Sequence, residues 1–366
     1  MRFGVEEEFL VVDAETRSVT ARAGDVVRAA GGRLGARVAG EITEHQVEGR
    51  TDPCDSAGEL AGQLAEGRAA IAAAAAGLGL RIIASGTPVL GDAVPAPVTR
   101  GERQDRGNAT FRGLHAELSL CALHVHVEIP DRDTAVLVSN HLRPYLPVLL
   151  ALAANSPYWD GRDTGYASWR SLFWARWPVA GAPPYFTSAA HYDELVAMLV
   201  EAEALVDAGT IFWDVRPSAH LPTLEVRGAD VPMTAAESAA MAALVRGLVA
   251  SLLPLVESGD PGPVVEPEMM RVAYWKAARD GMAGAGVDVL TGATLPARDL
   301  AARLLDAALP GLEEHGDLAR VTGWLTTLAE DGDGAARQRA AEAKNGLLTD
   351  VVDHLVEQTA QNGTFN

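Results

Sequence analysis

The chain has few cysteines, because Cys54 and Cys121 are the only two among its 366 residues. Two isolated cysteines form neither a CxxC zinc pattern nor a disulfide framework. A free cysteine usually packs like a small apolar side chain and is among the most buried residue types. We therefore expect two buried structural cysteines rather than catalytic thiols.

Basic residues are also scarce, since 30 Lys and Arg stand against 49 Asp and Glu and give a net charge of −19. Nucleic acids and anionic membranes bind proteins through basic surface. The composition therefore argues against both kinds of partner. It leaves nucleotide substrates open, because Mg²⁺ can mediate between phosphate and carboxylate groups.

Long apolar runs and targeting signals are missing as well. The most apolar long stretch, residues 146–154, is too short to span a bilayer and contains Pro147. The N-terminus enters a charged segment at once, without the pattern of a signal peptide. No GxxxxGKS/T motif occurs, and no GxGxxG motif follows a predicted strand. We predict a soluble cytoplasmic protein that would bind ATP, if at all, without a P-loop.

Apolar residues make up 48% of the chain, which is enough for a substantial core. Strand-forming patterns cover about 2–12, 42–50, 81–86, 120–129, 209–217 and 222–229. Helical patterns cover about 58–78, 134–155, 234–257, 266–281, 297–308, 316–330 and 334–360. Since these elements do not alternate as regular βαβ units, we predict an α+β fold with a largely antiparallel sheet and surrounding helices. We expect one domain, 1–366, in which a mainly helical portion (231–366) packs on a sheet-based catalytic core (1–230).

Three consecutive glutamates lie in the first predicted strand, between Val5 and Phe9. Side chains alternate between the faces of a strand, so Glu6 and Glu8 share one face and Glu7 takes the other. Two carboxylates on one face repel each other, and a bound cation would compensate them. Oxygen ligands of this kind suit Mg²⁺ together with a substrate phosphate. The alternative is an exposed acidic edge strand.

Three further predicted strands carry the same kind of polar face. Alternation places three polar residues on one face of each strand. They are Glu44, Gln46 and Glu48 in the first, His124, His126 and Glu128 in the second, and Thr223, Glu225 and Arg227 in the third. Apolar residues occupy the opposite face of the second and third strands. A sheet that is apolar on one side and lined with Glu, His and Arg on the other could form the floor of an active site.

Residues 155–186 differ in composition from the rest of the chain. The segment is rich in turn formers and arginine, and it holds four of the seven tryptophans. Long loops of this kind, carried on a scaffold, often contribute binding residues. We predict a substrate loop; the alternative is a surface loop ordered by its own aromatic side chains.

The motifs together resemble the glutamate–cysteine ligase type 2 family of carboxylate–amine ligases. They occur in the family's order over about residues 3–230: GVEEEF at 4–9, QVE at 46–48, HVHV at 124–127, NSP at 155–157, TGYAS at 164–168, WDVRPS at 213–218 and PTLEVR at 222–227. The stretch 275–281 also looks like the family's WxAARxG element. Any one motif alone would be weak, whereas their joint presence is specific.

The resemblance implies a fold related to the glutamine synthetase catalytic domain, with ATP and Mg²⁺ bound on the open face of the sheet. It also implies a reaction in which ATP phosphorylates the side-chain carboxylate of glutamate. An amine, cysteine in the best-known members, then attacks the γ-glutamyl phosphate and forms an amide. Small amino acids are thus the implied partners, and the family suggests a homo-oligomer such as a dimer.

The resemblance also carries residue roles. The implied metal ligands are Glu6, Glu8, Glu41, Glu48, His124 and Glu225. Arg227 would contact phosphate and act with Glu225 in catalysis, and His126 would contact nucleotide or metal. Arg170 and Arg216 would hold the substrate α-carboxylate or phosphates, because arginine offers bidentate geometry. Asn155 and Ser156 would bind substrate or cap the preceding helix, and we expect His45 and His115 to be structural or exposed.

Three departures from the family pattern affect the substrate rather than the metal ligands, and one is Glu128, which follows Val127 where a small residue is commoner. Ala122 stands where the family commonly has glycine, and residues 107–113 lack an expected Arg-Tyr element. A ligase acting on another amino acid therefore stays open. Two further hypotheses are a zinc-dependent hydrolase using His124 and His126, and a non-catalytic member of the fold.

Overall fold

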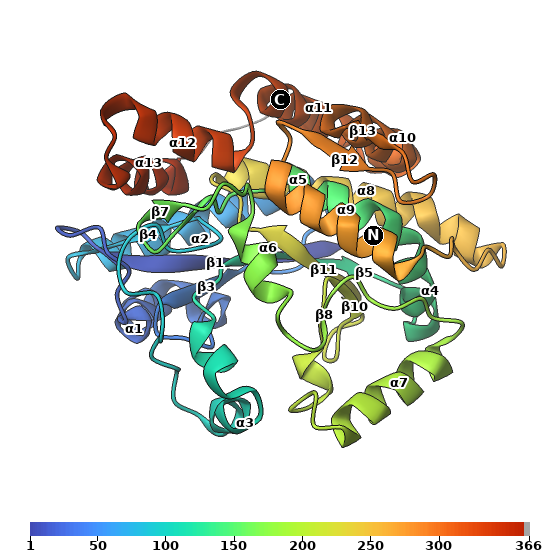
Figure 1. The fold of residues 1–366 in the computed structure, drawn as a ribbon, viewed down its shortest axis with the longest axis horizontal. Helices are drawn as coiled ribbons and strands as arrows, with labels where there is room; N and C mark the ends of the chain where they lie inside the picture. The colour runs from blue at the N-terminus through green and yellow to red at the C-terminus, as the bar shows by residue number, and fades with distance from the viewer. Residues whose placement is uncertain (362–366) are drawn as a thin grey trace.

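The protein is built around a seven-stranded sheet, as the computed structural model of residues 1–361 shows (Figure 1). The strands follow the order β10-β11-β5-β1-β3-β2, with β4 also paired to β1, and every pair is antiparallel. They are β1 (Phe3–Asp13), β2 (Val38–Gly40), β3 (Gln46–Arg50), β4 (Leu80–Ile83), β5 (Ala122–Glu128), β10 (Val215–Pro217) and β11 (Thr223–Asp230). The structure confirms the predicted α+β class with a largely antiparallel sheet.

Helices surround this sheet and dominate the C-terminal part of the chain (Figure 1). Those of the first part are α1 (Ala23–Leu34), α2 (Ala57–Ala76), α3 (Glu102–Phe111), α4 (Arg132–Leu142), α5 (Leu146–Leu152), α6 (Trp169–Trp174) and α7 (Ala189–Glu201). Those of the second part are α8 (Ala235–Glu257), α9 (Pro267–Asp280), α10 (Ala297–His315), α11 (Leu318–Asp331), α12 (Gly334–Asn345) and α13 (Leu348–Ala360). Short two-stranded ribbons are β6 (Tyr158–Trp159) with β7 (Arg162–Asp163), β8 (Ala180–Gly181) with β9 (Phe212–Trp213), and β12 (Ala285–Val287) with β13 (Thr294–Pro296).

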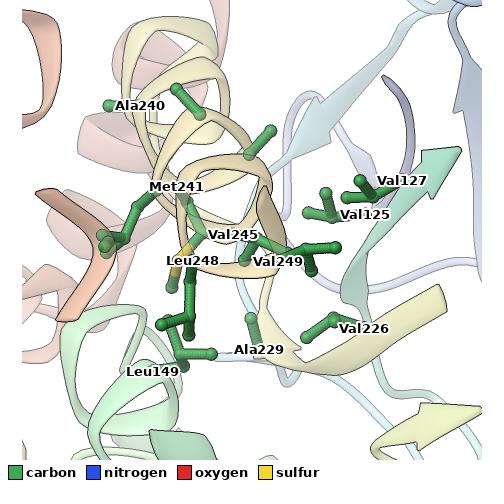
Figure 2. Packing of buried hydrophobic residues seen from close by; sticks show 14 of the residues in the cluster. Val125, Val127, Leu149, Val226, Ala229, Ala240, Met241, Val245, Leu248 and Val249 are labelled. Atoms are coloured by element: carbon green, nitrogen blue, oxygen red, sulfur yellow. The ribbon is translucent and has the colours of Figure 1, made fainter. Parts of the chain in front are cut away.

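The main core lies between the apolar face of the sheet and helix α8. Val125 and Val127 of β5 and Val226 of β11 pack against α8 and α5 (Figure 2). Helix α8 is apolar nearly all round, as a helix buried on all sides must be. Its N-cap is Thr234, whose side chain forms a capping box with Glu237. The alternation in β5 and β11 thus gives one face to the core and leaves the other free.

A second core covers both faces of the C-terminal half of β1. Phe9, Leu10, Val11 and Val12 are all buried, among side chains of α1, α2, β4 and α13. The polar face of the sheet is therefore limited to the N-terminal half of β1 and the strands beside it. A polar site on the sheet can therefore lie only in this part of it.

Several predicted boundaries differ from the structure for local reasons. The helix expected over 134–155 divides into α4, a 3-10 turn (Arg143–Tyr145) and α5, because Pro144 and Pro147 interrupt it. The helix expected over 334–360 divides into α12 and α13 at Gly346, which has φ 72°. Helices α1, α3, α6 and α7 were not predicted.

Two helical segments, Arg132–Leu152 and Ala235–Glu257, are long and apolar enough to cross a membrane by length and composition alone. Most of each segment is buried inside the protein. Core helices of soluble proteins pass the same test, so this observation is weak evidence for a membrane span.

Candidate active site

A cavity of about 530 Å³ opens on the polar face of the sheet. Ten of the twelve site residues predicted from the sequence line it: Glu6, Glu8, Glu41, Glu48, His124, His126, Arg170, Arg216, Glu225 and Arg227. The structure therefore gathers residues that lie up to 221 positions apart, between Glu6 and Arg227, into one space.

The antiparallel strand register brings these site residues together. Glu6 of β1 pairs with His124 of β5, and Glu8 pairs with Glu48 of β3. Further along the sheet, Glu225 of β11 stands between His126 and Arg216. Side chains at directly opposed positions lie about 5 Å apart and interact. Each polar residue thus meets a polar neighbour on the next strand.

An acidic cluster forms the first part of the site. Glu8, Glu41 and Glu48 each offer a carboxylate oxygen, and these atoms all lie within 4.8 Å of one another. Burial raises the pKa of Glu8 to about 7, against the pull of Arg170. Burial and the neighbouring carboxylates also raise the pKa values of Glu41 and Glu48. Three carboxylates that repel one another when ionised are suited to bind a cation.

A second group links Glu6 to the two histidines. Nδ1 of His124 lies 3.2 Å from Glu6 Oε2, and Nε2 of His126 lies 3.7 Å from the same oxygen. Burial alone would raise the pKa of Glu6, but the histidines outweigh it and lower this pKa. Burial and Arg227 lower the pKa of His124 to about 4, so its imidazole is neutral.

Paired arginines form the third part of the site. Arg216 donates two hydrogen bonds to the Glu225 carboxylate, at 2.9 and 3.3 Å. Burial alone would raise the pKa of Glu225, but Arg216 and Arg227 together lower it to about 2. A carboxylate held ionised in this way keeps its charge at any physiological pH.

A β-bulge directs Arg227 into the cavity. The register between β11 and β5 shifts between Val226 and Ala229, so two residues of β11 oppose His124. Arg227 Nη2 donates to His124 Nε2 at 3.3 Å, and its buried Nε lies 3.5 Å from Glu225 Oε1 without making a hydrogen bond among residues 1–361. The guanidinium also lies over the rings of Trp174 and Phe212, at 5.7 and 5.5 Å. It is therefore a fixed cation with hydrogen-bonding capacity left over.

Arg170 lines the cavity but is largely engaged elsewhere. It is 2% exposed and donates at 3.3 Å to the backbone oxygens of Gly228 and Arg227. These bonds tie helix α6 to the bulge of β11. The contacts seen here are those of a residue that supports Arg227.

Asn155 and Ser156 do not reach the cavity. The Asn155 amide donates to Ala84 and Val231, and its oxygen accepts from Gln338. Ser156 donates to Asp230 at 2.6 Å. Because these polar groups are occupied inside the protein, the structure does not support the prediction that they contact substrate.

Arg50 and His115 are two of several residues of the cavity wall that sequence reasoning missed. Arg50 pairs with Glu48 and lies 3.8 Å from Glu6, and alternation along β3 from Gln46 and Glu48 would have found it. Nδ1 of His115 lies 2.8 Å from Asn108 Oδ1. Nothing local in the sequence signals its position. Glu44, expected to share a face with Glu48, instead accepts a hydrogen bond from the Gly24 backbone.

The aromatic segment 155–186 contributes less to the cavity than expected. Within it only Arg170 and Trp174 line the cavity wall. Trp159, Trp174 and Trp177 pack with Phe212 in a buried cluster. The prediction of a substrate loop is therefore supported only at α6, and the aromatic side chains serve chiefly to order the segment.

The cavity differs from a zinc-hydrolase site. Within residues 1–361, the one cluster of three metal-binding side chains consists of glutamates. Nε2 of His124 accepts from a guanidinium, and Nδ1 of His126 lies 3.0 Å from the Thr223 hydroxyl. Hard cations suit such an oxygen-rich set better than zinc does.

Comparisons with known proteins agree on one family and one fold. The sequence profile of glutamate–cysteine ligase family 2 matches residues 2–356. A protein of Nocardia farcinica named "Putative glutamate--cysteine ligase 2-1" is 47% identical over 360 residues, 98% of this chain and 93% of the relative. A protein of Mycobacterium sp. (strain KMS) named "Putative glutamate--cysteine ligase 2-2" is 44% identical, over 97% of this chain and 98% of the relative.

Two solved structures share the fold at low sequence identity. A glutamate–cysteine ligase of Francisella tularensis in complex with AMP has a TM-score of 0.72 at 12% identity, over 98% of this chain and 89% of that one. A bifunctional glutathione synthetase of Pasteurella multocida has a TM-score of 0.71 at 16% identity, over 98% of this chain and 52% of that one. Both likenesses concern the fold.

Proposed function

Since the chain belongs to glutamate–cysteine ligase family 2, a family of ATP-dependent carboxylate–amine ligases, we propose that its cavity joins the side-chain carboxylate of glutamate to the amine of cysteine or another amino acid. ATP would phosphorylate the carboxylate, and the amine would displace phosphate from the resulting γ-glutamyl phosphate. A free carboxylate is a poor electrophile, so phosphorylation supplies the leaving group that amide formation needs.

The acidic cluster is the observation that carries this proposal. Carboxylate oxygens of the buried Glu8 and Glu48 and of the half-buried Glu41 lie within 4.8 Å of one another, and burial together with mutual repulsion raises the pKa values of the three groups. Like charges held this close indicate a site for a cation. A cation among carboxylates is the usual means of holding nucleotide phosphates in a protein of net negative charge.

The residues present fit Mg²⁺ in the role that the family implies. Glu8, Glu41 and Glu48 would be its main ligands, and Glu6, His124 and Glu225 adjoin them in the same cavity. When bound, Mg²⁺ neutralises phosphate charge and stabilises the transferring phosphoryl group. The carboxylate donors match the preference of this ion for hard oxygen ligands.

The chain's own cations supply the complementary part. We propose that Arg227 donates to a phosphoryl oxygen from Nε, which makes no hydrogen bond within residues 1–361, because the guanidinium is already fixed between aromatic rings and the bulge. Groups oriented before the reaction need no reorganisation during it. Glu225 and Arg216 would hold each other and the substrate end of the cavity in place. Nε2 of His126 is buried, lies 3.7 Å from Glu6 Oε2 and meets no hydrogen-bond criterion within residues 1–361, and in this proposal it contacts nucleotide or substrate.

Glutamate and cysteine are proposed from the names of the relatives. A different amine is the second candidate, because Ala122 and residues 107–113 depart from the family pattern. A cytoplasmic location and a homodimer are likewise proposals, which the bulk composition and the family support respectively.

The experiment is an assay of ADP release with Mg²⁺ and ATP, in which glutamate is combined with each amino acid in turn and products are identified by mass. ADP together with a γ-glutamyl amide is the expected result, and the amine giving the largest kcat/KM is the acceptor. No ADP with any pair would reject the proposal. A metal analysis for zinc would then decide the hydrolase hypothesis.

A matched pair of variants links the activity to the cavity. Glu48→Gln should abolish ADP release with little change in volume. Glu128→Gln removes the same charge from the same face of the sheet, at a partly exposed position paired with Arg2. It should keep the wild-type rate. Equal rates of ADP release in the two variants would show that the acidic cluster is not needed for the reaction.

A further inference from the structure

Three residues of the family motifs converge on one buried carboxylate behind the cavity. This carboxylate belongs to Asp230, the last residue of β11, which is 1% exposed and does not line the cavity itself. Its Oδ2 accepts hydrogen bonds from the Asn155 backbone N–H at 2.9 Å and from the Ser156 hydroxyl at 2.6 Å. Its Oδ1 accepts a hydrogen bond from the Ser168 hydroxyl at 2.9 Å. The motifs that do not reach the cavity therefore hold this carboxylate in place.

Asp230 faces Arg170, whose side chain does line the cavity. Nη1 of Arg170 lies 3.6 Å from Asp230 Oδ1, and both side chains are at most 3% exposed. The same guanidinium donates to the backbone oxygens of Arg227 and Gly228 in the bulge of β11. The Ser156 hydroxyl also accepts a hydrogen bond from the Arg170 backbone N–H at 3.1 Å. Asp230 and Ser156 thus fix Arg170 at its side chain and at its backbone.

A glycine makes room for this arrangement. A Cβ atom on Gly86 would lie 2.8 Å from Asp230 Cγ and 2.9 Å from Ser156 Cβ. Contacts this short do not occur between real side chains, so the backbone at position 86 can approach the pair only because it carries no Cβ. The carboxylate is therefore confined on the side away from the cavity.

The charge of Asp230 offsets a repulsion between two arginines. Burial and Arg216 lower the pKa of Arg227, and Arg170 lowers it further, because like charges repel each other. Burial raises the pKa of Asp230, whereas Arg170 and the three hydrogen bonds pull this pKa back down. A carboxylate next to Arg170 therefore helps the buried guanidinium to stay beside the bulge.

Stability alone does not explain a buried ion pair at this place. Removing a carboxylate and a guanidinium from water costs about as much as their attraction returns, and apolar residues of the same volume often stabilise a fold equally well. An ion pair with fixed hydrogen bonds does, however, orient its arginine. Orientation matters here, because a misplacement of about 1 Å in an active site can cost about 10²-fold in rate.

We propose that Asp230 is a positioning residue of the ligase reaction: it holds Arg170, and through Arg170 the bulge that presents Arg227 to the transferring phosphoryl group. This inference rests on the proposed function, in which Arg227 contacts that group. The Asn155, Ser156 and Ser168 motif residues then serve the reaction from behind the cavity, without touching substrate.

The kinetic test compares two buried aspartates that each face a buried arginine. Asp230→Asn keeps the shape of the side chain but removes its charge. Asp317→Asn makes the same change at the partner of Arg246, which ties α8 to the start of α11 away from the cavity. In Asp230→Asn, kcat should fall about 10²-fold while KM for ATP changes less than about threefold, because Arg227 acts on the phosphoryl group in transfer. In Asp317→Asn, both constants should stay within about twofold of the wild type.

The control separates positioning from general destabilisation. Both variants are assayed at a temperature at which circular dichroism shows them folded. A kcat of Asp230→Asn within about twofold of the wild type would overturn the proposal. An equal loss of kcat in Asp317→Asn would overturn it too, because the loss would then follow from lower stability.

A double variant tests the route through Arg227. If Asp230 acts by positioning Arg227, then Asp230→Asn should cost less than about threefold in kcat when Arg227→Lys is already present. Losses that multiply in full would show that the two residues act independently and would refute the route. Ser156→Ala is the milder change if Asp230→Asn does not fold, and it should lower kcat about three- to tenfold. An unchanged kcat in Ser156→Ala would count against the proposal.

Hydrogen exchange measures the positioning without the reaction. In Asp230→Asn, backbone amides of 169–174 and 225–228 should exchange about tenfold faster than in the wild type, and in Asp317→Asn they should not. Unchanged exchange in Asp230→Asn would overturn the proposal whatever the assay gives. Faster exchange together with a wild type that releases no ADP would instead reject the proposed function and keep the link between Asp230 and the bulge.

Discussion

Glu7 and Glu8 are neighbours in strand β1, but they point to opposite faces of the sheet and have opposite electrostatic surroundings. Glu7 faces the helix layer, where Arg68 donates to both of its oxygens and the Ser238 hydroxyl donates at 2.5 Å. Glu8 faces the cavity, where the Ala122 backbone N–H donates to it at 2.7 Å and other carboxylates surround it. Both residues are at most 6% exposed.

The difference shows what each face requires. A buried carboxylate in a core is destabilising unless it is paired and hydrogen-bonded, and Glu7 meets both conditions. Ionising the carboxylates of the acidic cluster costs stability in the metal-free protein, as their raised pKa values show. The negative charge on the cavity face is thus compensated by what binds there, whereas the charge of Glu7 on the helix face is compensated within the folded chain.

The largest expected effect is on the helix face, from Arg68→Met. This change keeps much of the side-chain volume but leaves Glu7 as a buried unpaired charge. The free energy of unfolding should fall by about 3–5 kcal/mol, measured by urea denaturation. The double variant Glu7→Gln/Arg68→Met should recover part of this loss. A loss under about 1 kcal/mol for the single variant would contradict the comparison.

On the cavity face, Arg227→Lys should reduce kcat about 10²–10³-fold with little loss of stability. Lysine keeps the charge but lacks the planar fork that contacts His124 and a phosphoryl group together. The measurement is ADP release at saturating substrates, with the exposed Arg132→Lys as control. Wild-type turnover would show that a point charge suffices there.

Glu225→Gln tests the same face through the partner of that arginine. It removes a charge but little volume, and we expect phosphoryl transfer to be lost while the fold is kept. Far-UV circular dichroism and ADP release measure the two properties. Full activity would remove Glu225 from the mechanism.

The pH dependence of stability should reveal the acidic cluster in metal-free protein. The pKa of Glu8 is about 7 in the fold against an ordinary 4.5, so its favourable contribution is fully present below about pH 4.5 and is lost as pH rises through 7. Glu8→Gln should therefore raise stability at pH 8 by roughly 3 kcal/mol at most and leave it unchanged at pH 4.

Mg²⁺ provides the control for this effect. It should stabilise the wild type at pH 8 through binding linkage, and stabilise Glu8→Gln less. Thermal unfolding with and without Mg²⁺ measures both. A Glu8→Gln variant that is less stable than the wild type at pH 8 would contradict the assignment of strain to this cluster.

The smallest expected effect comes from Ser56→Ala at the start of α2, the helix that carries Arg68. Ser56 accepts a hydrogen bond from the Glu59 backbone at 3.2 Å. Its loss should cost about 1 kcal/mol of stability and leave kcat/KM unchanged. A change in kcat/KM would show that the two faces are coupled more tightly than their contacts suggest.

The sequence anticipated many of the charged side chains of the cavity because alternation in a strand is a local property. His124 and His126 could be placed opposite Leu123 and Val125 without any knowledge of the fold, and the structure agrees. Arg50 could have been found in the same way. Asn155 was misplaced because its motif marks a buried hydrogen-bond network rather than a cavity wall.

What the sequence by itself determined is the face on which each strand residue lies, since side chains alternate with a fixed period of two. Only the tertiary structure decided which residues meet. Glu41 joins Glu8 and Glu48 from a segment outside any strand, and the bulge that directs Arg227 toward His124 depends on how β11 pairs with β5. The register between strands and the path of the connecting segments bring together residues that are distant in sequence. The periodic pattern within one strand does not encode either of these properties.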